Sequence, residues 1–126
     1  MDTDFTTWLS QIPWSSVGIL AVLVAFFLWN SLRKRGSRAR LLAKIVAGAL
    51  VVDVRSRGEF EGGHYDGAIN LPVDTLAKQT KRIGALDRPV IVYCASGGRS
   101  SQAAAILRGA GFTDVTNAGG LAHMPR

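Results

Sequence analysis

The stretch "PVIVYCASGGRSSQAAAILRGAGF" (residues 89–112) contains the only cysteine of the chain, Cys94. Its first part is a short β-branched run without polar alternation, which predicts a strand buried on both faces. Two glycines follow, and the alanine-rich segment after them predicts a helix that ends at a glycine. A buried strand that passes through a short turn into a helix is typical of α/β folds with a parallel sheet.

The segments around this stretch have the same alternation of strands and helices. Strands are predicted for "LVVDV" (50–54), "GAINLP" (67–72) and "DVTNA" (114–118). Helices are predicted for "RLLAKIVAGA" (40–49) with Gly48 as C-cap, for "SRGEFEGG" (56–63), and for "VDTLAKQTKRIG" (73–84) with Asp74 as N-cap. Since helices separate the strands, we expect crossover connections and a mostly parallel sheet.

Cys94 lies where parallel sheets bind ligands, just beyond the carboxyl end of a strand. Gly97 and Gly98 allow positive φ, so the backbone can turn its N–H groups inward. We expect Ser100 and Ser101 to open the next helix, whose first N–H groups are unpaired. With Arg99 nearby, these features favour a thiolate, because cations and helix N-termini lower a cysteine pKa from ≈ 8.5 to ≈ 3.5–7.5. The alternative is a buried structural cysteine.

Residues near two predicted strand ends are candidate supporting groups. Asp53 and Arg55 follow the first strand, with Glu59 and His64 a little further on. They could support the cysteine loop or contact substrate. In the alternative, Asp53 pairs with Arg55 and His64 hydrogen-bonds to the backbone. We favour this alternative because buried polar groups usually need hydrogen-bond partners.

The N-terminal region carries no charge between Asp4 and Arg33. Residues 12–32 reach the ~20 residues needed to cross a bilayer as a helix. Trp8, Trp14 and Trp29 flank the apolar run, as expected for side chains at the two membrane interfaces. A buried core helix or an interfacial helix would have a polar face, and a signal peptide would have its basic residues before the apolar run. We therefore predict a transmembrane helix over 12–32.

The basic residues of the chain are concentrated after this segment. The formal charge of +6 comes from a short cluster: Arg33, Lys34, Arg35, Arg38, Arg40 and Lys44. From residue 50 onward, nine basic residues face seven acidic ones, which is not the pattern of a nucleic-acid-binding face. Basic residues stay on the cytoplasmic side of a membrane, so residues 1–11 are predicted to lie outside. A basic linker (33–40) and a cytoplasmic domain (41–126) follow, in a single-pass inner or plasma membrane protein.

Three motifs together resemble the single-domain rhodaneses, the thiosulfate-type sulfurtransferases. "VVDVRSRGEFEGGHYDGAINLP" is similar to the family's N-terminal signature, "YCASGGRSSQAA" to its active-site loop and following helix, and "GFTDVTNAGGL" to its last strand and glycine turn. The resemblance implies a small rhodanese-like α/β fold, a parallel sheet flanked by helices, preceded here by one transmembrane α-helix. Residues after the last glycine turn depart from the family, which often has a tryptophan there.

The resemblance also implies an activity and a site. Cys94 would take the outer sulfur of thiosulfate or a similar donor as a persulfide and pass it to a thiol, cyanide or protein acceptor. The loop residues that would surround this sulfur are Ala95, Ser96, Gly97, Gly98, Arg99 and Ser100. No metal or organic cofactor is needed, and the other partner expected is the lipid bilayer around residues 12–32.

Two alternatives to sulfur transfer stay open. Rhodanese-like domains also serve as docking or regulatory modules, here for a membrane partner. Phosphatases and arsenate reductases related to the fold use a similar loop, but these phosphatases tend to have five residues between Cys and Arg. This chain has four, Ala95 to Gly98, and a smaller ring suits one sulfur atom better than a phosphoryl group.

Overall fold

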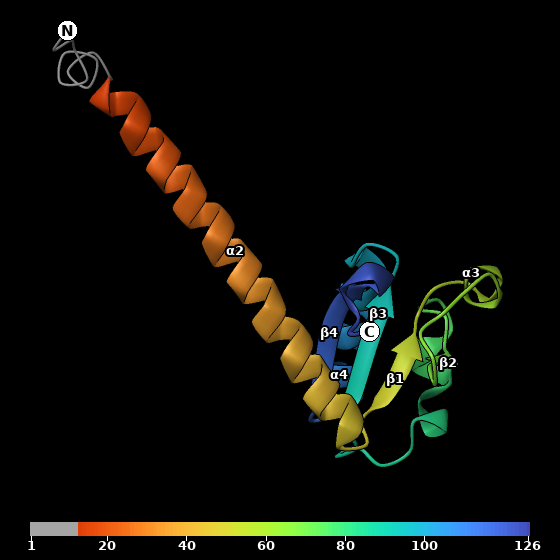
Figure 1. Ribbon diagram of the computed structural model, residues 1–126. Helices are drawn as coiled ribbons and strands as arrows, with labels where there is room; N and C mark the ends of the chain where they lie inside the picture. Colours follow the sequence, from red (N-terminus) through yellow and green to blue (C-terminus); the bar gives the residue numbers. More distant parts are fainter. Residues whose placement is uncertain (1–12) are drawn as a thin grey trace, which may run out of the picture. The chain divides into compact units, whose positions relative to one another are not determined.

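A computed structural model describes residues 13–126 (Figure 1). The chain divides into two compact units, one that ends at Ser37 and one that runs from Arg38 to Arg126. The predictions for residues 1–11 and for Trp8 lie outside the described residues. The second unit contains the sheet and the cysteine loop, and every contact discussed below lies within it.

The first element is a helix, α2 (Trp14–Val46), of 33 residues. The sequence predicts a linker at 33–40, but the structure continues the helix through it because Arg and Ala are strong helix formers and one Gly costs only about 1 kcal/mol. Gly48, with φ of 100°, ends the helix. The Ala49 and Gly48 amides donate to the carbonyls of Lys44 and Ile45 at 2.9 and 3.0 Å, a Schellman motif that confirms the predicted C-cap.

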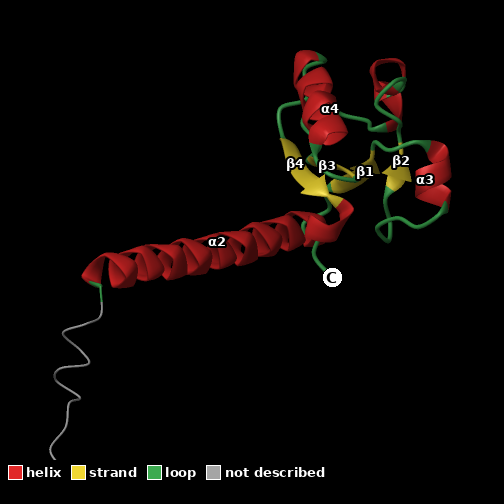
Figure 2. Ribbon diagram, turned by 90° about the horizontal axis from the view of Figure 1, so that it is seen from above, coloured by secondary structure: helices red, strands yellow, loops and turns green. Residues whose placement is uncertain are grey.

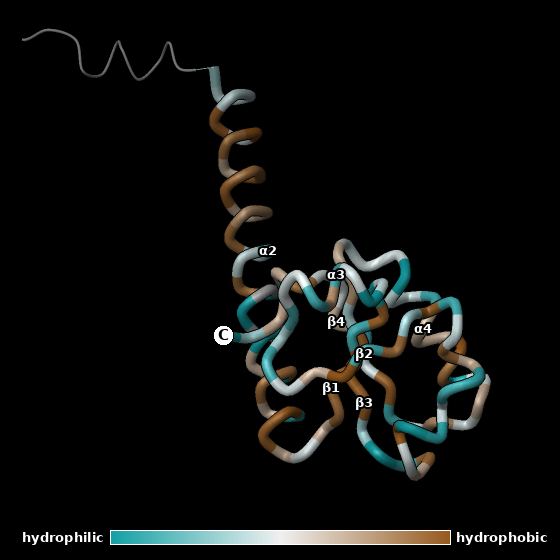
Figure 3. The backbone as a smooth tube through the Cα atoms, turned by 90° about the vertical axis from the view of Figure 1, so that its right-hand side faces the viewer, coloured by the Kyte–Doolittle hydropathy of each residue, from teal (hydrophilic) through white to brown (hydrophobic). Residues whose placement is uncertain are grey.

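The N-terminal part of α2 is apolar on all sides, as its colouring in Figure 3 shows. An 18-residue window has a mean hydropathy of 1.9, and none of that window is buried in the structure. Phe27 and Trp29, for example, are 71% and 69% exposed. By length and composition alone α2 is able to cross a membrane, a test that signal sequences near an N-terminus also pass.

The sheet has four parallel strands in the order β2-β1-β3-β4. They are β1 (Leu50–Asp53), β2 (Ile69–Asn70), β3 (Val90–Cys94) and β4 (Val115–Gly120). Two helices accompany them, α3 (Arg57–Glu61) after β1 and α4 (Gly98–Gly109) after β3. The predicted parallel α/β fold is confirmed. Because all strands run the same way, Asp53, Cys94 and Gly120 end at one edge of the sheet.

Alternate residues of the central strands build two apolar layers. Val52, Val92 and Cys94 pack with Ala103 and Leu107 of α4, which lies on one face of the sheet in Figure 2. The other face is built from neighbouring positions, namely Val51, Ile91 and Tyr93, which pack with Leu41, Ile45 and Met124. Burial on both faces explains why β3 is entirely apolar, and it leaves the strand ends as the place for polar chemistry.

The connection between β2 and β3 differs from the prediction. The amphipathic helix expected over 73–84 is two short 3-10 helices, Leu76–Lys78 and Thr80–Arg82, and the residue before the first is Thr75 rather than Asp74. β-Branched Thr75 and Thr80 lower helix propensity. Leu76 and Ile83 are nevertheless fully buried, so burial of these two side chains holds the connection on the core without a regular helix.

Candidate active site

Cys94 is the last residue of β3, and only three residues separate it from the first turn of α4. Gly97 precedes α4 with φ of 110°, a left-handed conformation that favours glycine. The sequence predicts the same freedom for Gly98 and a helix start at Ser100, but the helix begins at Gly98. Consequently Arg99 and Ser100 lie inside the first turn, where backbone N–H groups have no partner within the helix.

The thiol of Cys94 is 1% exposed and surrounded by donors. The Gly97 amide donates to Sγ at 2.9 Å. Burial raises the pKa of Cys94, but hydrogen bonds from the Ser100 hydroxyl and from the amides of Ser100, Gly97 and Ser96 outweigh it, so the pKa lies below its ordinary value. The loop therefore favours a thiolate, which is the reactive form of cysteine.

Ser100 brings a fully buried hydroxyl to the same sulfur. Its Oγ lies 3.4 Å from Cys94 Sγ, 3.1 Å from the Gly97 carbonyl and 3.3 Å from the Gly119 carbonyl. One hydroxyl proton can serve one of these acceptors at a time, and an ionised sulfur attracts it more strongly than a neutral carbonyl does. The Ser100 hydroxyl is thus placed to donate its hydrogen bond to the Cys94 thiolate, and to donate it to one of the two carbonyls when the thiol is neutral.

Arg99 forms a two-pronged ion pair with Glu59 of α3. Its Nη1 and Nη2 atoms donate to the two Glu59 carboxylate oxygens at 2.6 and 2.9 Å. The Arg99 guanidinium and the Ser56 hydroxyl hold the pKa of Glu59 at about 2. The contact ties α3 to the first turn of α4 and so fixes the position of the Arg99 side chain. The sequence analysis names Glu59 as a candidate supporting group, but nothing in the sequence identified it as the partner of Arg99.

Asp53, Arg55 and Tyr93 form a buried polar network beneath the loop. The Asp53 carboxylate accepts from the Arg55 amide and side chain and, at 2.7 Å, from the Tyr93 hydroxyl. Arg55 Nη2 also donates to the Gly63 carbonyl at 2.6 Å. Asp53 is 0% and Arg55 is 8% exposed, so each charge depends on the other. Hydrogen bonding to Asp53 raises the pKa of Arg55.

Tyr93 and Asn70 connect this network to the segment that follows α3, and neither was predicted as a site residue from the sequence. Tyr93 has its hydroxyl 2.9 Å from the Tyr65 amide, which donates to it. The Asn70 side chain donates to the carbonyls of Asp53 and Arg55 at 3.0 and 2.9 Å. Through these contacts the segment from 63 to 70 is held against the ends of β1 and β3.

His64 lies beside this network without joining it. Its Nδ1 atom is 2.9 Å from the Phe60 carbonyl, and its ring stacks on the Phe60 ring at 3.7 Å between centroids. This matches the backbone-bonded alternative weighed for His64 from the sequence. The ring also lines a pocket next to Ala95.

The end of β4 supports the loop from the opposite side. Cys94 pairs with Gly120, after an irregularity in register that leaves Ala118 without a partner in β3. A Cβ atom on Gly120 would lie 2.5 Å from the Ala95 carbonyl oxygen, closer than atoms can approach. Gly120 is therefore required for the close packing of the loop.

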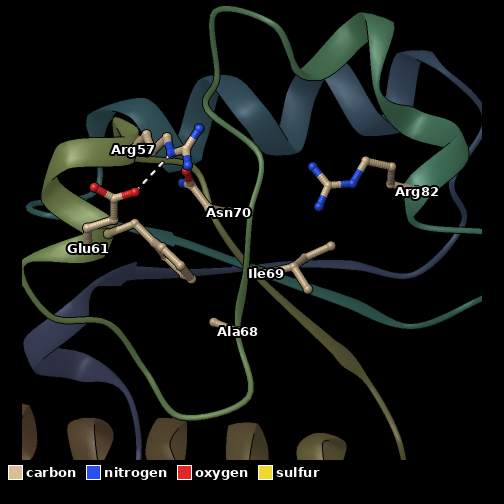
Figure 4. Close-up of a pocket in the computed structure, with 7 residues that line it drawn as sticks. Arg57, Glu61, Ala68, Ile69, Asn70 and Arg82 are labelled. Atoms are coloured by element: carbon tan, nitrogen blue, oxygen red, sulfur yellow. Dashed lines mark hydrogen bonds and ion pairs between the residues drawn. The ribbon is translucent and has the colours of Figure 1, made fainter.

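Two pockets differ in their relation to Cys94. One, of about 660 Å³, is lined by Ala95 and by residues on either side of it, including Arg55, His64, Tyr65, Leu121 and Met124. Another, of about 440 Å³, lies over β2 (Figure 4), with Arg57 paired to Glu61 and Arg82 on the opposite side. The β2 pocket includes no residue of the cysteine loop, whereas the first includes Ala95, the residue after Cys94.

Comparison with known proteins agrees with this fold and loop. Residues 37–122 match the family model described as "Rhodanese-like domain". The chain is 39% identical over 82 residues to the thiosulfate sulfurtransferase GlpE of Pseudomonas entomophila, covering 65% of this chain and 74% of GlpE. It is 46% identical over 69 residues to YqhL of Bacillus subtilis, covering 55% of this chain and 54% of YqhL.

Solved structures of rhodaneses also resemble the fold of this chain. A structure described as "rhodanese with anions from E. coli" superposes with a TM-score of 0.59 at 36% identity, covering 62% of this chain and 95% of that one. The chain belongs to the rhodanese-like domain family. This confirms the resemblance drawn from the three sequence motifs, while the chain spans only about half the length of YqhL.

Proposed function

We propose that this protein is a membrane-anchored sulfurtransferase that carries a sulfane sulfur on Cys94. The observation that carries the proposal is the Cys94 sulfur at the end of β3, which accepts the Gly97 amide at 2.9 Å and has a lowered pKa. A thiolate of this kind is a good nucleophile for a sulfane sulfur. Similarity to GlpE, a thiosulfate sulfurtransferase, supports thiosulfate or a similar donor.

The reaction has two displacement steps. The Cys94 thiolate attacks the outer sulfur of thiosulfate, the new S–S bond forms, and sulfite leaves with the electron pair of the broken bond. An acceptor thiolate or cyanide then attacks the same outer sulfur, and Cys94 leaves as a thiolate. The amides of Ser96, Gly97 and Ser100 stabilise negative charge on the sulfur in both steps.

Mass spectrometry of the intact protein tests this proposal. After exposure to thiosulfate, the protein should gain the mass of one sulfur atom and release one sulfite. Cys94→Ser should gain nothing, while Ser101→Ala, a change at an exposed neighbour in α4, should behave as wild type. A wild-type protein that gains no sulfur from a panel of sulfane donors contradicts the proposal, and faster turnover of an aryl phosphate would favour a phosphatase.

We further propose that the apolar part of α2 spans a membrane with its N-terminus outside and the rhodanese-like domain in the cytoplasm. The argument is the cluster of basic residues that follows the apolar run, since such residues stay on the cytoplasmic side. Protease added to right-side-out and to inverted membrane vesicles separates the two orientations. The domain should be digested only in inverted vesicles; release of the protein by high salt or carbonate would exclude a spanning helix.

A further inference from the structure

The pocket beside Ala95 is larger than the proposed donor requires. Its volume of about 660 Å³ lies within the ≈ 300–1,000 Å³ range of sites for organic ligands. Its lining includes His64 and Tyr65, Leu121 and Met124 near the C-terminus, and the cations Arg55 and Arg126. The apolar side chains among these residues can accommodate the carbon skeleton of an organic molecule.

The hydrogen bond of His64 determines which ring nitrogen carries the proton. Nδ1 lies 2.9 Å from the Phe60 carbonyl oxygen, which can only accept, so in the neutral ring Nδ1 is the donor. Nε2 is then left with a lone pair, and among residues 13–126 it has no hydrogen-bond partner. Stacking on Phe60, with the rings 12° from parallel, holds the imidazole in this orientation.

Other charged groups also line the pocket. Arg55 is bound to Asp53, and Arg126 is a cation. Asp66 also lines the pocket, two residues after His64. We choose His64 as the proton acceptor because its free ring nitrogen is held in one orientation by the Phe60 contacts.

We propose that His64 is the catalytic base of the second step and takes the proton of a neutral thiol acceptor that enters this pocket. This rests on the function proposed above. The acceptor S–H gives its proton to His64 Nε2, and the resulting thiolate attacks the outer sulfur of the Cys94 persulfide. A new S–S bond forms on the acceptor, the S–S bond to Cys94 breaks, and its electron pair returns to Sγ. No oxidant or reductant is consumed.

The test compares the two half-reactions in the full chain held in detergent micelles. Wild type and His64→Asn are loaded with thiosulfate, and the loss of the persulfide mass is followed with three acceptors. These are 2-mercaptoethanol, an aromatic thiol already ionised at the assay pH, and sulfite. Asn retains a donor near the Nδ1 position, so the contact with the Phe60 carbonyl can persist while the base is removed.

His64→Asn should load at the wild-type rate and discharge to 2-mercaptoethanol on the order of 100-fold more slowly, the lower range for a general base. Discharge to the ionised thiol and to sulfite should change less than about twofold, because neither needs a base. His123→Asn, the same change at the other histidine, should leave the ratio between acceptors unchanged. Ala122→Trp, which fills the pocket from an exposed position, should raise KM for 2-mercaptoethanol but not for sulfite.

The possible failures are distinguishable. If wild type does not load, the proposed sulfurtransferase function fails. If wild type loads but His64→Asn slows discharge to all three acceptors equally, His64 has only a structural role, and the inference is overturned. If His64→Asn discharges to every acceptor at the wild-type rate, the proton goes elsewhere, and the inference is again overturned.

Discussion

The hydroxyl oxygen of Ser100 lies 3.4 Å from the sulfur of Cys94, and both residues are at most 1% exposed. The two are brought together by the helix that starts at Gly98, which folds the chain back over the end of β3. In this buried place a hydroxyl that can donate to a thiolate stabilises the ionised form, because few water molecules compete for the sulfur. Our first prediction follows from this contact.

Ser100→Ala should raise the pKa of Cys94, since the hydroxyl now helps to lower it. Hydrogen bonds to charged groups contribute about 1.5–3 kcal/mol, so persulfide formation near neutral pH should slow about tenfold or more. The rate should approach that of wild type as the pH rises and both proteins become thiolates. The pH dependence of Cys94 alkylation by iodoacetamide measures the shift in the Cys94 pKa, with Ser101→Ala as control. If the midpoint of this pH dependence is the same in Ser100→Ala and wild type, Ser100 does not stabilise the thiolate.

Glu59→Gln should reduce the acid sensitivity of the fold. The pKa of Glu59 is lowered from 4.5 to about 2 by Arg99, so its contribution to stability is present above pH 4.5 and is lost as the pH falls toward 2. Urea unfolding at a series of pH values should therefore show that the free energy of unfolding decreases less for the variant than for wild type over this pH range. Glu61→Gln removes a more exposed pair with Arg57 and should follow wild type. Parallel curves for Glu59→Gln and wild type would contradict the prediction.

Gly120→Ala should displace the cysteine loop. The added methyl group would lie 2.5 Å from the Ala95 carbonyl oxygen, so either the loop or the end of β4 must move. We expect a loss of about 1–3 kcal/mol in the free energy of unfolding and a large decrease in persulfide formation. Gly109→Ala is the matched control, because its Cβ meets nothing within 4 Å and a helical Gly→Ala change is neutral or stabilising. Wild-type activity in Gly120→Ala would show that the loop tolerates the shift.

Asp53→Asn should destabilise the protein by about 3–5 kcal/mol, because it leaves the buried Arg55 cation without its partner. The double variant Asp53→Asn/Arg55→Met removes both charges and should recover part of this loss. Chemical denaturation followed by circular dichroism measures both values. Equal losses in the single and double variants would show that the ion pair is not the cause.

The order of strands and helices could be read from local sequence. β3 is apolar on both faces because it is central, so its composition alone identified it as a buried strand. The Gly48 cap was predicted because the end of a helix depends on the conformational freedom of one residue. Local patterns failed in the two 3-10 helices after β2, where burial of Leu76 and Ile83 holds the connection on the core.

By itself the sequence determined the α/β class, the apolar N-terminal segment, and Cys94 with its four-residue spacing to Arg99, because these depend on composition and on neighbours along the chain. Only the tertiary structure decided which distant side chains meet. It joined Arg99 to Glu59 and Tyr93 to Asp53, each forty residues apart, and it placed the backbone of β4 against the cysteine loop. Such contacts depend on which strands are neighbours in the sheet, and the order β2-β1-β3-β4 is not the order along the chain.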